Sequence, residues 1–166
     1  MLIQLLVGAG VSAVCIVMHA IVTVGAVRIA RAAVSLSSTY RGLHLPAVMT
    51  ATAFVLMLAH TVEIFVWSTA YAVVRVAPEN TSLVYFAFVN YTTLGYGDIV
   101  PRPDWQLLGP MTAMNGILMF GWSTALIFEV LLKTIERYQS LPTPAAGDGP
   151  TGLSMQPDER HDVPLV

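Results

Sequence analysis

Residues 83–98 read LVYFAFVNYTTLGYGD, an apolar stretch that gives way to a glycine-rich segment. As a helix, residues 83–93 would be about 16 Å long, roughly half the thickness of a membrane's hydrocarbon core. After Tyr91 the apolar residues stop, and the chain passes through Gly95 and Gly97. Irregular backbone at membrane depth is tolerated only where it is buried in protein or lines a wet pathway. The stretch therefore predicts a re-entrant loop.

Three long apolar segments flank this loop. Residues 2–27 and 47–74 precede it, and residues 105–132 follow it. A helix of about 20 apolar residues spans a bilayer, and all three segments exceed that length. The first segment is not a signal peptide, since it has no basic residues before its apolar run, and Arg28 and Arg31 follow the run instead of preceding it. We therefore predict an all-α membrane protein with three transmembrane helices per chain and one re-entrant helix.

Composition supports this class and excludes others. Hydrophobic residues make up 55% of the chain and charged residues 11%, against about 25% charged in soluble domains. A net charge of −2 argues against a nucleic-acid partner. The four histidines, one cysteine and scattered acids show neither metal spacing nor a nucleophile motif. We therefore expect no enzymatic activity and no cofactor.

Basic residues are distributed unevenly around the spans. Six of them lie between the first two spans or after the third: Arg28, Arg31, Arg41, Lys133, Arg137 and Arg160. Only Arg75 and Arg102 lie in the connection that holds the re-entrant stretch. Because Lys and Arg accumulate on the cytoplasmic side, we expect a multi-pass protein of the cell membrane with its N-terminus outside and its C-terminus in the cytoplasm.

The glycine-rich segment has the residues that a cation pathway needs. Gly95 and Gly97 permit backbone angles that are closed to other residues, so alternate peptide units can turn their carbonyls to one side. A row of carbonyls together with the Thr93 hydroxyl would replace the water shell of a dehydrated monovalent cation. One chain supplies only one wall of such a pathway, so several chains must surround an axis.

In this segment the sequence resembles the pore-loop potassium channels, which have an outer helix, a pore helix, a selectivity filter and an inner helix. Thr-Leu-Gly-Tyr-Gly matches their filter signature, with Leu where Val is commoner, and Asp98 follows as it does in the family. The resemblance covers about residues 47–132. It implies a homotetramer in the lipid bilayer whose central pore conducts potassium, the permeant ion, past the filter residues Thr93, Leu94, Gly95, Tyr96 and Gly97. The carbonyls of the first four and the Thr93 hydroxyl would hold the K⁺ ions.

This resemblance divides the chain into four parts. Residues 1–31 would be an additional N-terminal transmembrane helix, and residues 32–46 a cytoplasmic loop. Residues 47–133 would form the pore module. Residues 134–166 mix Pro, Gly, Asp and Thr without apolar periodicity toward their end, which predicts a disordered cytoplasmic tail.

Residues near the filter depart from the family pattern. Val89 stands where several bacterial members carry a glutamate that pairs with the aspartate after the filter, here Asp98. Tyr85 and Phe86 occupy positions where many relatives have two tryptophans. The two aromatic residues either support Tyr96 as an aromatic cuff or pack in the membrane.

Gating candidates lie in the third span. Gly116 and Gly121 resemble the family's hinge region, and Gly116 is the better candidate for a hinge because glycine weakens a helix. The alternative is close helix packing through a small face. Aligning these glycines with the family turns Ile117, Thr124 and Phe128 toward the pore, where Phe128 would form a hydrophobic constriction. No span carries basic residues at every third position, which excludes a voltage sensor.

Polar residues inside the spans are expensive and therefore informative. Glu63 lies near the middle of residues 47–74, and His60 shares its helical face. Asn115 of the third span lies at a similar depth. We predict that Glu63 is buried, protonated or paired with His60, and hydrogen-bonded to Asn115, either to lock two helices together or to act as a proton switch. His19 is interpreted as a satisfied polar residue.

Two alternatives to a potassium-selective channel stay open. A non-selective cation channel would have the same architecture with a looser filter, but Tyr96 argues against it because relaxed relatives commonly change that residue. A non-conducting membrane subunit that modulates another channel is less compatible with an intact filter signature.

Overall fold

The computed structural model describes residues 1–36 and 41–140, and the side chains of residues 1–29 and 45–136. The described residues form helices and loops without a strand. The helices are α1 (Leu2–Leu36), α2 (Arg41–Val74), α3 (Leu83–Tyr91), the 3-10 turn η1 (Pro103–Trp105) and α4 (Leu108–Ser140). The predicted all-α fold is confirmed.

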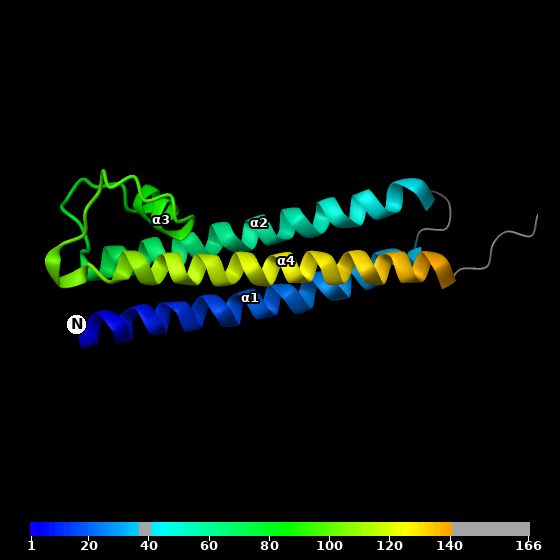
Figure 1. The fold of residues 1–166 in the computed structure, drawn as a ribbon, viewed down its shortest axis with the longest axis horizontal. Helices are drawn as coiled ribbons and strands as arrows, with labels where there is room; N and C mark the ends of the chain where they lie inside the picture. The colour runs from blue at the N-terminus through cyan, green and yellow to red at the C-terminus, as the bar shows by residue number, and fades with distance from the viewer. Residues whose placement is uncertain (37–40, 141–166) are drawn as a thin grey trace, which may run out of the picture.

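Three of the described helices are long and apolar enough to cross a membrane. The candidate spans are Leu2–Ile29, Leu45–Val74 and Pro103–Glu136. In Figure 1 the three long helices lie side by side, and the short α3 lies beside them at one end. The N-terminus is at the same end as α3. A chain of three spans therefore brings its N-terminus and its re-entrant loop to one side of the bundle.

The helices extend beyond the predicted spans. Helix α1 ends at Leu36 and α2 begins at Arg41, so both run into the expected loop at residues 32–46. Pro46 lies inside α2, although proline is normally confined to the first turn of a helix. Helix α4 continues to Ser140. Residues 37–40 of the expected loop and 141–166 of the expected tail lie outside the described residues.

Helix α2 ends in a Schellman motif, which positions the chain that leads to α3. Arg75 takes the left-handed position with φ 51°, its N–H donates to the Ala72 carbonyl, and the Val76 N–H donates to the Tyr71 carbonyl. The Val76 carbonyl in turn accepts from the Arg102 N–H at 2.8 Å. This hydrogen bond joins the connection between α2 and α3 to the segment that leads from the glycine-rich loop into η1.

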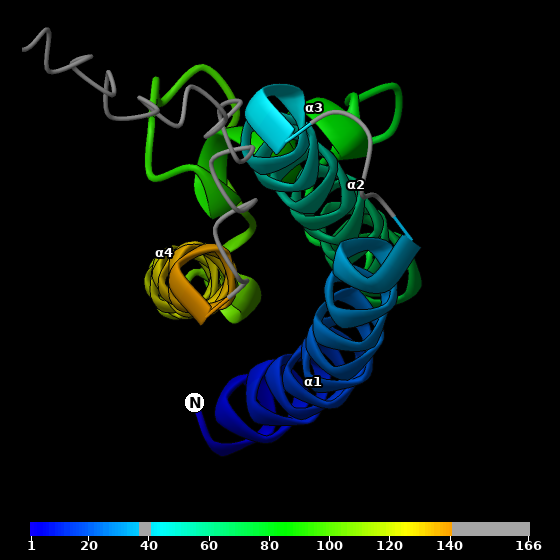
Figure 2. The same cartoon turned by 90° about the vertical axis from the view of Figure 1, so that its right-hand side faces the viewer.

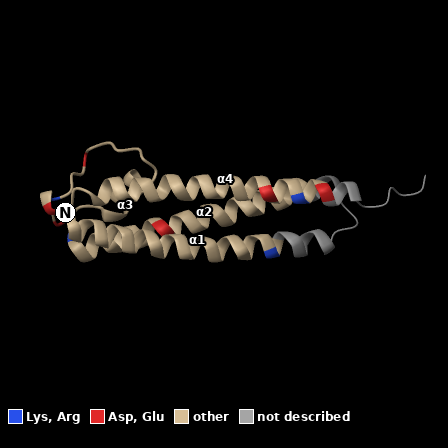
Figure 3. Ribbon diagram, turned by 60° about the horizontal axis from the view of Figure 1, so that its bottom comes forward, with Lys and Arg blue, Asp and Glu red and all other residues tan. Residues whose placement is uncertain are grey.

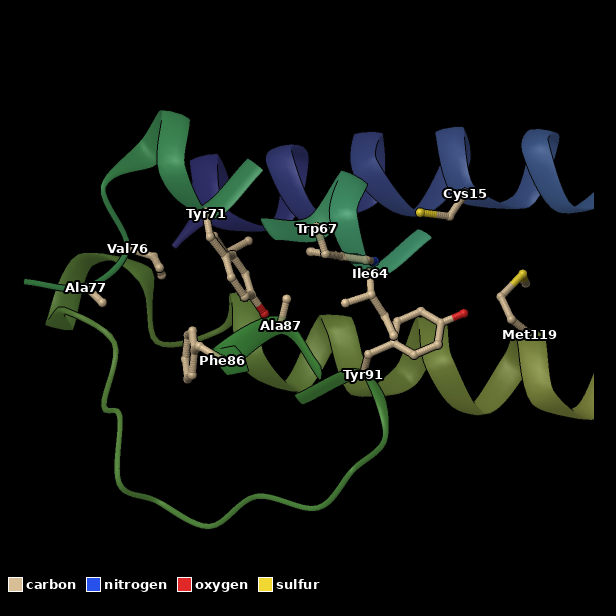
Figure 4. Close-up of a cluster of buried hydrophobic side chains, with 11 residues drawn as sticks. Cys15, Ile64, Trp67, Tyr71, Val76, Ala77, Phe86, Ala87, Tyr91 and Met119 are labelled. Carbon is tan, nitrogen blue, oxygen red and sulfur yellow. The ribbon is translucent and has the colours of Figure 1, made fainter. Parts of the chain in front are cut away.

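Aromatic side chains fill the space between α2, α3 and α4 (Figure 4). Trp67 and Tyr71 of α2 are fully buried, as is Tyr91 of α3. Phe86 is 4% exposed and its ring centroid lies 5.2 Å from that of Tyr71. Burying side chains of this size holds the short α3 against the two long helices.

Charged side chains lie mainly near the two ends of the bundle (Figure 3). Within Leu45–Val74 the only charged residue is Glu63. Figure 2 shows α4 end-on, with α1 and α2 inclined to it. An apolar surface with charges near its ends is the distribution that a lipid bilayer requires.

Candidate functional site

The re-entrant helix α3 ends in a second Schellman motif. The Leu94 N–H donates to the Val89 carbonyl at 2.9 Å, and the Thr93 N–H donates to the Asn90 carbonyl at 3.0 Å. Thr92 is the C-cap residue, and Thr93 takes the left-handed position with φ 61°. The motif turns the chain sharply out of the helix and starts the glycine-rich segment in a defined direction.

Threonine is an unusual residue at this left-handed position. Non-glycine residues seldom adopt positive φ, and for a β-branched residue it is an outlier. Such strain costs about 1–3 kcal/mol and is concentrated at functional sites. Glycine would form the same cap without the strain. The hydroxyl of Thr93 is therefore the feature that glycine could not supply.

Positive φ recurs at every second residue of the segment. Thr93 has φ 61°, Gly95 59° and Gly97 76°, whereas Leu94 and Tyr96 do not have positive φ. The Gly95 N–H reaches the Val89 carbonyl at 3.3 Å. The Leu94 and Tyr96 side chains are 55% and 66% exposed. The predicted filter is thus an extended strip of alternating handedness on the surface of the single chain.

Three of the residues predicted to support the filter, Tyr85, Val89 and Asp98, have interactions next to it. The Asp98 carboxylate raises the pKa of Tyr85, because hydrogen bonding to the carboxylate favours the protonated phenol. The Ile99 N–H donates to Asp98 Oδ1 at 3.1 Å. Val89 is buried, and its carbonyl anchors the filter backbone. Several relatives have a glutamate at the position of Val89 that pairs with the aspartate after the filter. In this chain the Tyr85 phenol takes that role as the partner of Asp98.

A hydrogen-bonded chain fixes α3 between α2 and α4. Asn90 Nδ2 donates to the Tyr71 hydroxyl at 3.4 Å. The Tyr71 hydroxyl lies 2.6 Å from Thr112 Oγ1, and Thr112 donates to the Leu108 carbonyl. A β-carbon at Gly109 would lie 3.3 Å from Asn90 Oδ1, so α4 approaches α3 closely here.

Gly116 has a packing role against α3. An added β-carbon would overlap the Tyr91 carbonyl oxygen and would lie 3.3 Å from the Tyr91 ring. Gly121 is different, because a β-carbon there would meet no atom within 4 Å. Of the two readings left open for Gly116, hinge or close packing, the contact with Tyr91 favours packing.

The residues expected to face the pore share one face of α4. Ile117 and Phe128 are each 61% exposed, and Thr124 is exposed as well. Gly121 is exposed on the same helix. Their spacing of three to four residues places these side chains in one stripe. This stripe is not covered by any described part of the chain.

Glu63 is fully buried and has partners on three helices. Its Oε1 lies 2.8 Å from His19 Nδ1 of α1. The Tyr91 hydroxyl of α3 donates to its Oε2, and His60 Nδ1 of α2 lies 3.5 Å from the same oxygen. His60 is thus within ion-pair distance, as the sequence predicted, but His19 and Tyr91 are nearer partners.

The predicted hydrogen bond between Glu63 and Asn115 is wrong. Asn115 Oδ1 instead accepts from Trp67 Nε1 at 3.0 Å, and Asn115 Nδ2 has no hydrogen-bond partner among the described residues. Trp67 lies one helical turn from Glu63 on α2. The depth comparison was therefore right to about one turn, but α4 is rotated so that Asn115 contacts the tryptophan.

Sequence reasoning missed three members of this buried cluster: Tyr91, His19 and Ser123. His19 contacts Glu63, and Ser123 of α4 lies 3.2 Å from His19 Nε2 and 3.0 Å from His60 Nε2. His19 was recognised as polar within a span but was not assigned a partner. The usable signal was that polar residues inside membrane helices generally pair with one another.

The comparison with known proteins agrees with this architecture. The family model described as "Ion channel" matches residues 47–133, which include most of α2, all of α3, the glycine-rich segment and most of α4. No curated protein and no solved structure matches the chain significantly. The fold and the re-entrant segment define the chain as a multi-pass membrane protein of the channel class. It belongs to the ion channel family whose pore is formed by two transmembrane helices and the loop between them.

Proposed function

We propose that this protein is a potassium-selective channel that conducts K⁺ passively through Thr93, Leu94, Gly95, Tyr96 and Gly97. The observation that carries the proposal is the alternating sign of φ along this segment. Alternation of this kind lets successive peptide units present their carbonyls to one side. A row of carbonyls is the device that replaces the hydration shell of K⁺.

The strained Thr93 supports selectivity for a dehydrated cation. Its hydroxyl stands at the inner end of the carbonyl row, where the chain leaves the C-terminus of α3. A helix C-terminus carries a partial negative charge, which favours a cation nearby. The pathway needs no cofactor, and the proposal assigns the protein no catalytic activity and no nucleic-acid partner.

The exposure of the filter supports a homotetramer. Leu94 and Tyr96 are more than half exposed on the single chain, as is the stripe of α4 that contains Ile117 and Phe128. Four copies around one axis would bring four filter strips together and would let the stripe line the inner pore. Phe128 is then the candidate for a hydrophobic constriction.

The orientation of the channel follows from its basic residues. The N-terminus and the re-entrant loop share one end of the bundle. The excess of Lys and Arg lies toward the other end and in the residues beyond it. We place the filter at the outer face of the cell membrane and the C-terminus in the cytoplasm.

Flux from reconstituted vesicles tests the function. Purified protein in K⁺-loaded liposomes is expected to let K⁺ flow out down its gradient. The resulting membrane potential draws protons in through an added protonophore, and a pH-sensitive dye reports their uptake. A Na⁺ gradient of equal size is expected to give little signal. Equal K⁺ and Na⁺ flux would indicate a non-selective cation channel. No flux with either ion would favour a non-conducting subunit.

A further inference from the structure

The buried cluster around Glu63 forms a closed ring of polar contacts. Glu63 Oε1 lies 2.8 Å from His19 Nδ1, and His19 Nε2 lies 3.2 Å from Ser123 Oγ. Ser123 Oγ lies 3.0 Å from His60 Nε2, and His60 Nδ1 lies 3.1 Å from the Tyr91 hydroxyl. The Tyr91 hydroxyl donates to Glu63 Oε2 and closes the ring. His19, Glu63 and Tyr91 are fully buried, and Ser123 is 6% exposed. The ring joins all four helices.

The number of hydrogens in this ring can be counted from the chemistry of its members. Five contacts require five hydrogens, one for each. Two neutral imidazoles contribute one hydrogen each, the phenol and the hydroxyl contribute one each, and an ionised carboxylate contributes none. The total is four. With Glu63 ionised and both histidines neutral, one contact must therefore join two acceptors.

A fifth hydrogen completes the ring and also balances its charge. It sits on a histidine opposite an ionised Glu63, or on the Glu63 carboxyl itself. In either form the ring is electrically neutral overall. Without it, the ring keeps a net negative charge in the middle of a membrane span, where an uncompensated charge is unfavourable. The arrangement of donors and the cost of burial both favour one bound proton.

We propose that the ring of His19, Ser123, His60, Tyr91 and Glu63 is a proton-binding site that holds one labile proton. Other ionisable groups near it are few. Cys15 lies one turn before His19 and is fully buried. At this level helix α4 contributes Ser123 and the rings of Phe120 and Trp122, and none of these side chains is acidic or basic. The nearest charged residue of α4 is Glu129, six residues further along the helix.

His19, His60 and Glu63 also satisfy the distance criterion for a metal site, since one ligand atom from each lies within 4.8 Å of the others. Two histidines and a carboxylate are a donor set that zinc accepts. Here, however, each of the four imidazole nitrogens of His19 and His60 already has a hydrogen-bond partner. The observed contacts therefore favour a proton over a metal ion.

The ring is connected to the filter through Tyr91. Tyr91 is the last residue of α3, and its hydroxyl belongs to the ring. Two residues later the chain reaches the strained Thr93. Loss of the proton would weaken the contact between α1 and α2 and change the partners of Tyr91. Protonation would thereby act on the base of the filter, a step that rests on the proposed function.

The Glu63→Gln variant gives a sharp test, because a carboxamide supplies the missing hydrogen permanently. Its NH₂ group can donate to His19 and its oxygen can accept from Tyr91, so the ring is complete without an extra proton. We expect the thermal stability of the purified wild-type protein to fall as pH rises above about 6.5, the ordinary pKa of histidine. Over that window the unfolding equilibrium should shift about tenfold per pH unit, the signature of one proton.

The sign follows from the proton count. Above about pH 6.5 the unfolded chain has neutral histidines and an ionised Glu63, so it binds one proton fewer than the folded ring, and stability decreases as pH rises. Glu63→Gln should remove this slope. If the variant does not assemble, infrared spectroscopy of the wild type is the second measurement. It should show the uptake of one proton by the folded protein as the pH is lowered.

Three results would overturn the proposal. They are a flat pH profile in the wild type, the same slope in Glu63→Gln, and zinc retained in equimolar amount through purification with a stability gain that His19→Gln abolishes. None of these measurements requires ion conduction. A failure of the proposed potassium flux would therefore be distinguishable from a failure of the proton site.

Discussion

At the scale of single residues, Thr93 shows how local geometry and function meet. The Schellman motif at the end of α3 needs a left-handed residue, and the channel proposal needs a hydroxyl at the same position. Thr93 supplies both at the cost of backbone strain. The Thr92 hydroxyl, by contrast, donates to the Phe88 carbonyl and only caps the helix.

Gly95→Ala is expected to reduce potassium flux about tenfold or more. At φ 59° the added β-carbon costs about 1–2 kcal/mol in each chain, and a barrier increase of that size slows transport about tenfold or more. Within one chain the new carbon has room, since the nearest atom is the Thr93 carbonyl oxygen at 4.0 Å. The protein should therefore still insert into the membrane.

Liposome flux measures this effect, with Gly25→Ala as the matched control. Gly25 lies in α1, and a β-carbon there meets nothing within 4 Å. Wild-type flux and selectivity in Gly95→Ala would contradict the filter assignment.

Tyr85→Phe is expected to destabilise the conducting filter without preventing assembly. The substitution removes the phenol that binds Asp98 and leaves the ring in place. Sustained K⁺ current should decline faster during a long recording than in the wild type. Asp98→Asn should have a similar effect, and a Tyr85→Phe current as steady as that of the wild type would show that this contact does not support the filter.

At the scale of helices, the two glycines of α4 have separable roles. Gly116 lets α4 approach the end of α3, whereas Gly121 has open space around it. Gly116 is therefore a packing residue, and only Gly121 lacks a packing reason within the described chain.

Gly116→Ala is expected to destabilise the protein by about 1–3 kcal/mol, the usual cost of overpacking. The new methyl group would overlap the Tyr91 carbonyl, which is backbone and cannot rotate away. Gly121→Ala is the matched control, because it makes the same chemical change on the same helix. Thermal unfolding in detergent should separate the two variants, and equal melting temperatures would refute the packing role.

Helix α1 supplies the nearest basic partner of Glu63, because His19 Nδ1 lies 2.8 Å from its Oε1. A truncated chain that begins after residue 27 would lose His19, and the Glu63 carboxylate would lose its nearest basic partner. An acidic residue at mid-span costs roughly 2.5–3.5 kcal/mol, so we expect poor assembly of the truncated chain. Glu63→Leu in that chain should restore assembly. If the truncated chain assembles equally well with and without the second change, α1 does not serve this purpose.

The long helices and the re-entrant loop were predictable, because burial in lipid demands apolar runs of defined length. The helix ends were not, since Arg41 and Ser140 continue their helices where hydropathy carries no signal. The sequence also did not determine which residues of the other helices form hydrogen bonds with Glu63. Depth along the membrane places Asn115 near Glu63, but it does not determine the rotation of α4, which turns Asn115 to Trp67.

At the scale of the whole molecule, the single chain leaves two surfaces exposed that the proposed channel would cover. Its filter strip and the exposed stripe of α4 lack partners in the described chain. The extra helix α1 packs against α2 and α4 of its own chain, and in the proposed tetramer it would lie at the periphery.

A homotetramer predicts a protein mass of about four times 17.9 kDa in detergent. Light scattering coupled to size exclusion, corrected for bound detergent, measures this mass. Cross-linking should give a ladder that ends at four chains. A mass of two chains would exclude a closed ring with four filter strips.

The pairing of His19 with Glu63 also bears on how the chain enters the membrane. Ribosomes deliver α1 before α2, so the histidine is in place when the carboxylate arrives. The first two helices can then partition into lipid as a hairpin whose charge is already compensated, before Tyr91 and Ser123 have been synthesised. We therefore expect α1 to favour the insertion of α2, and the ring to close only when α3 and α4 have joined the hairpin.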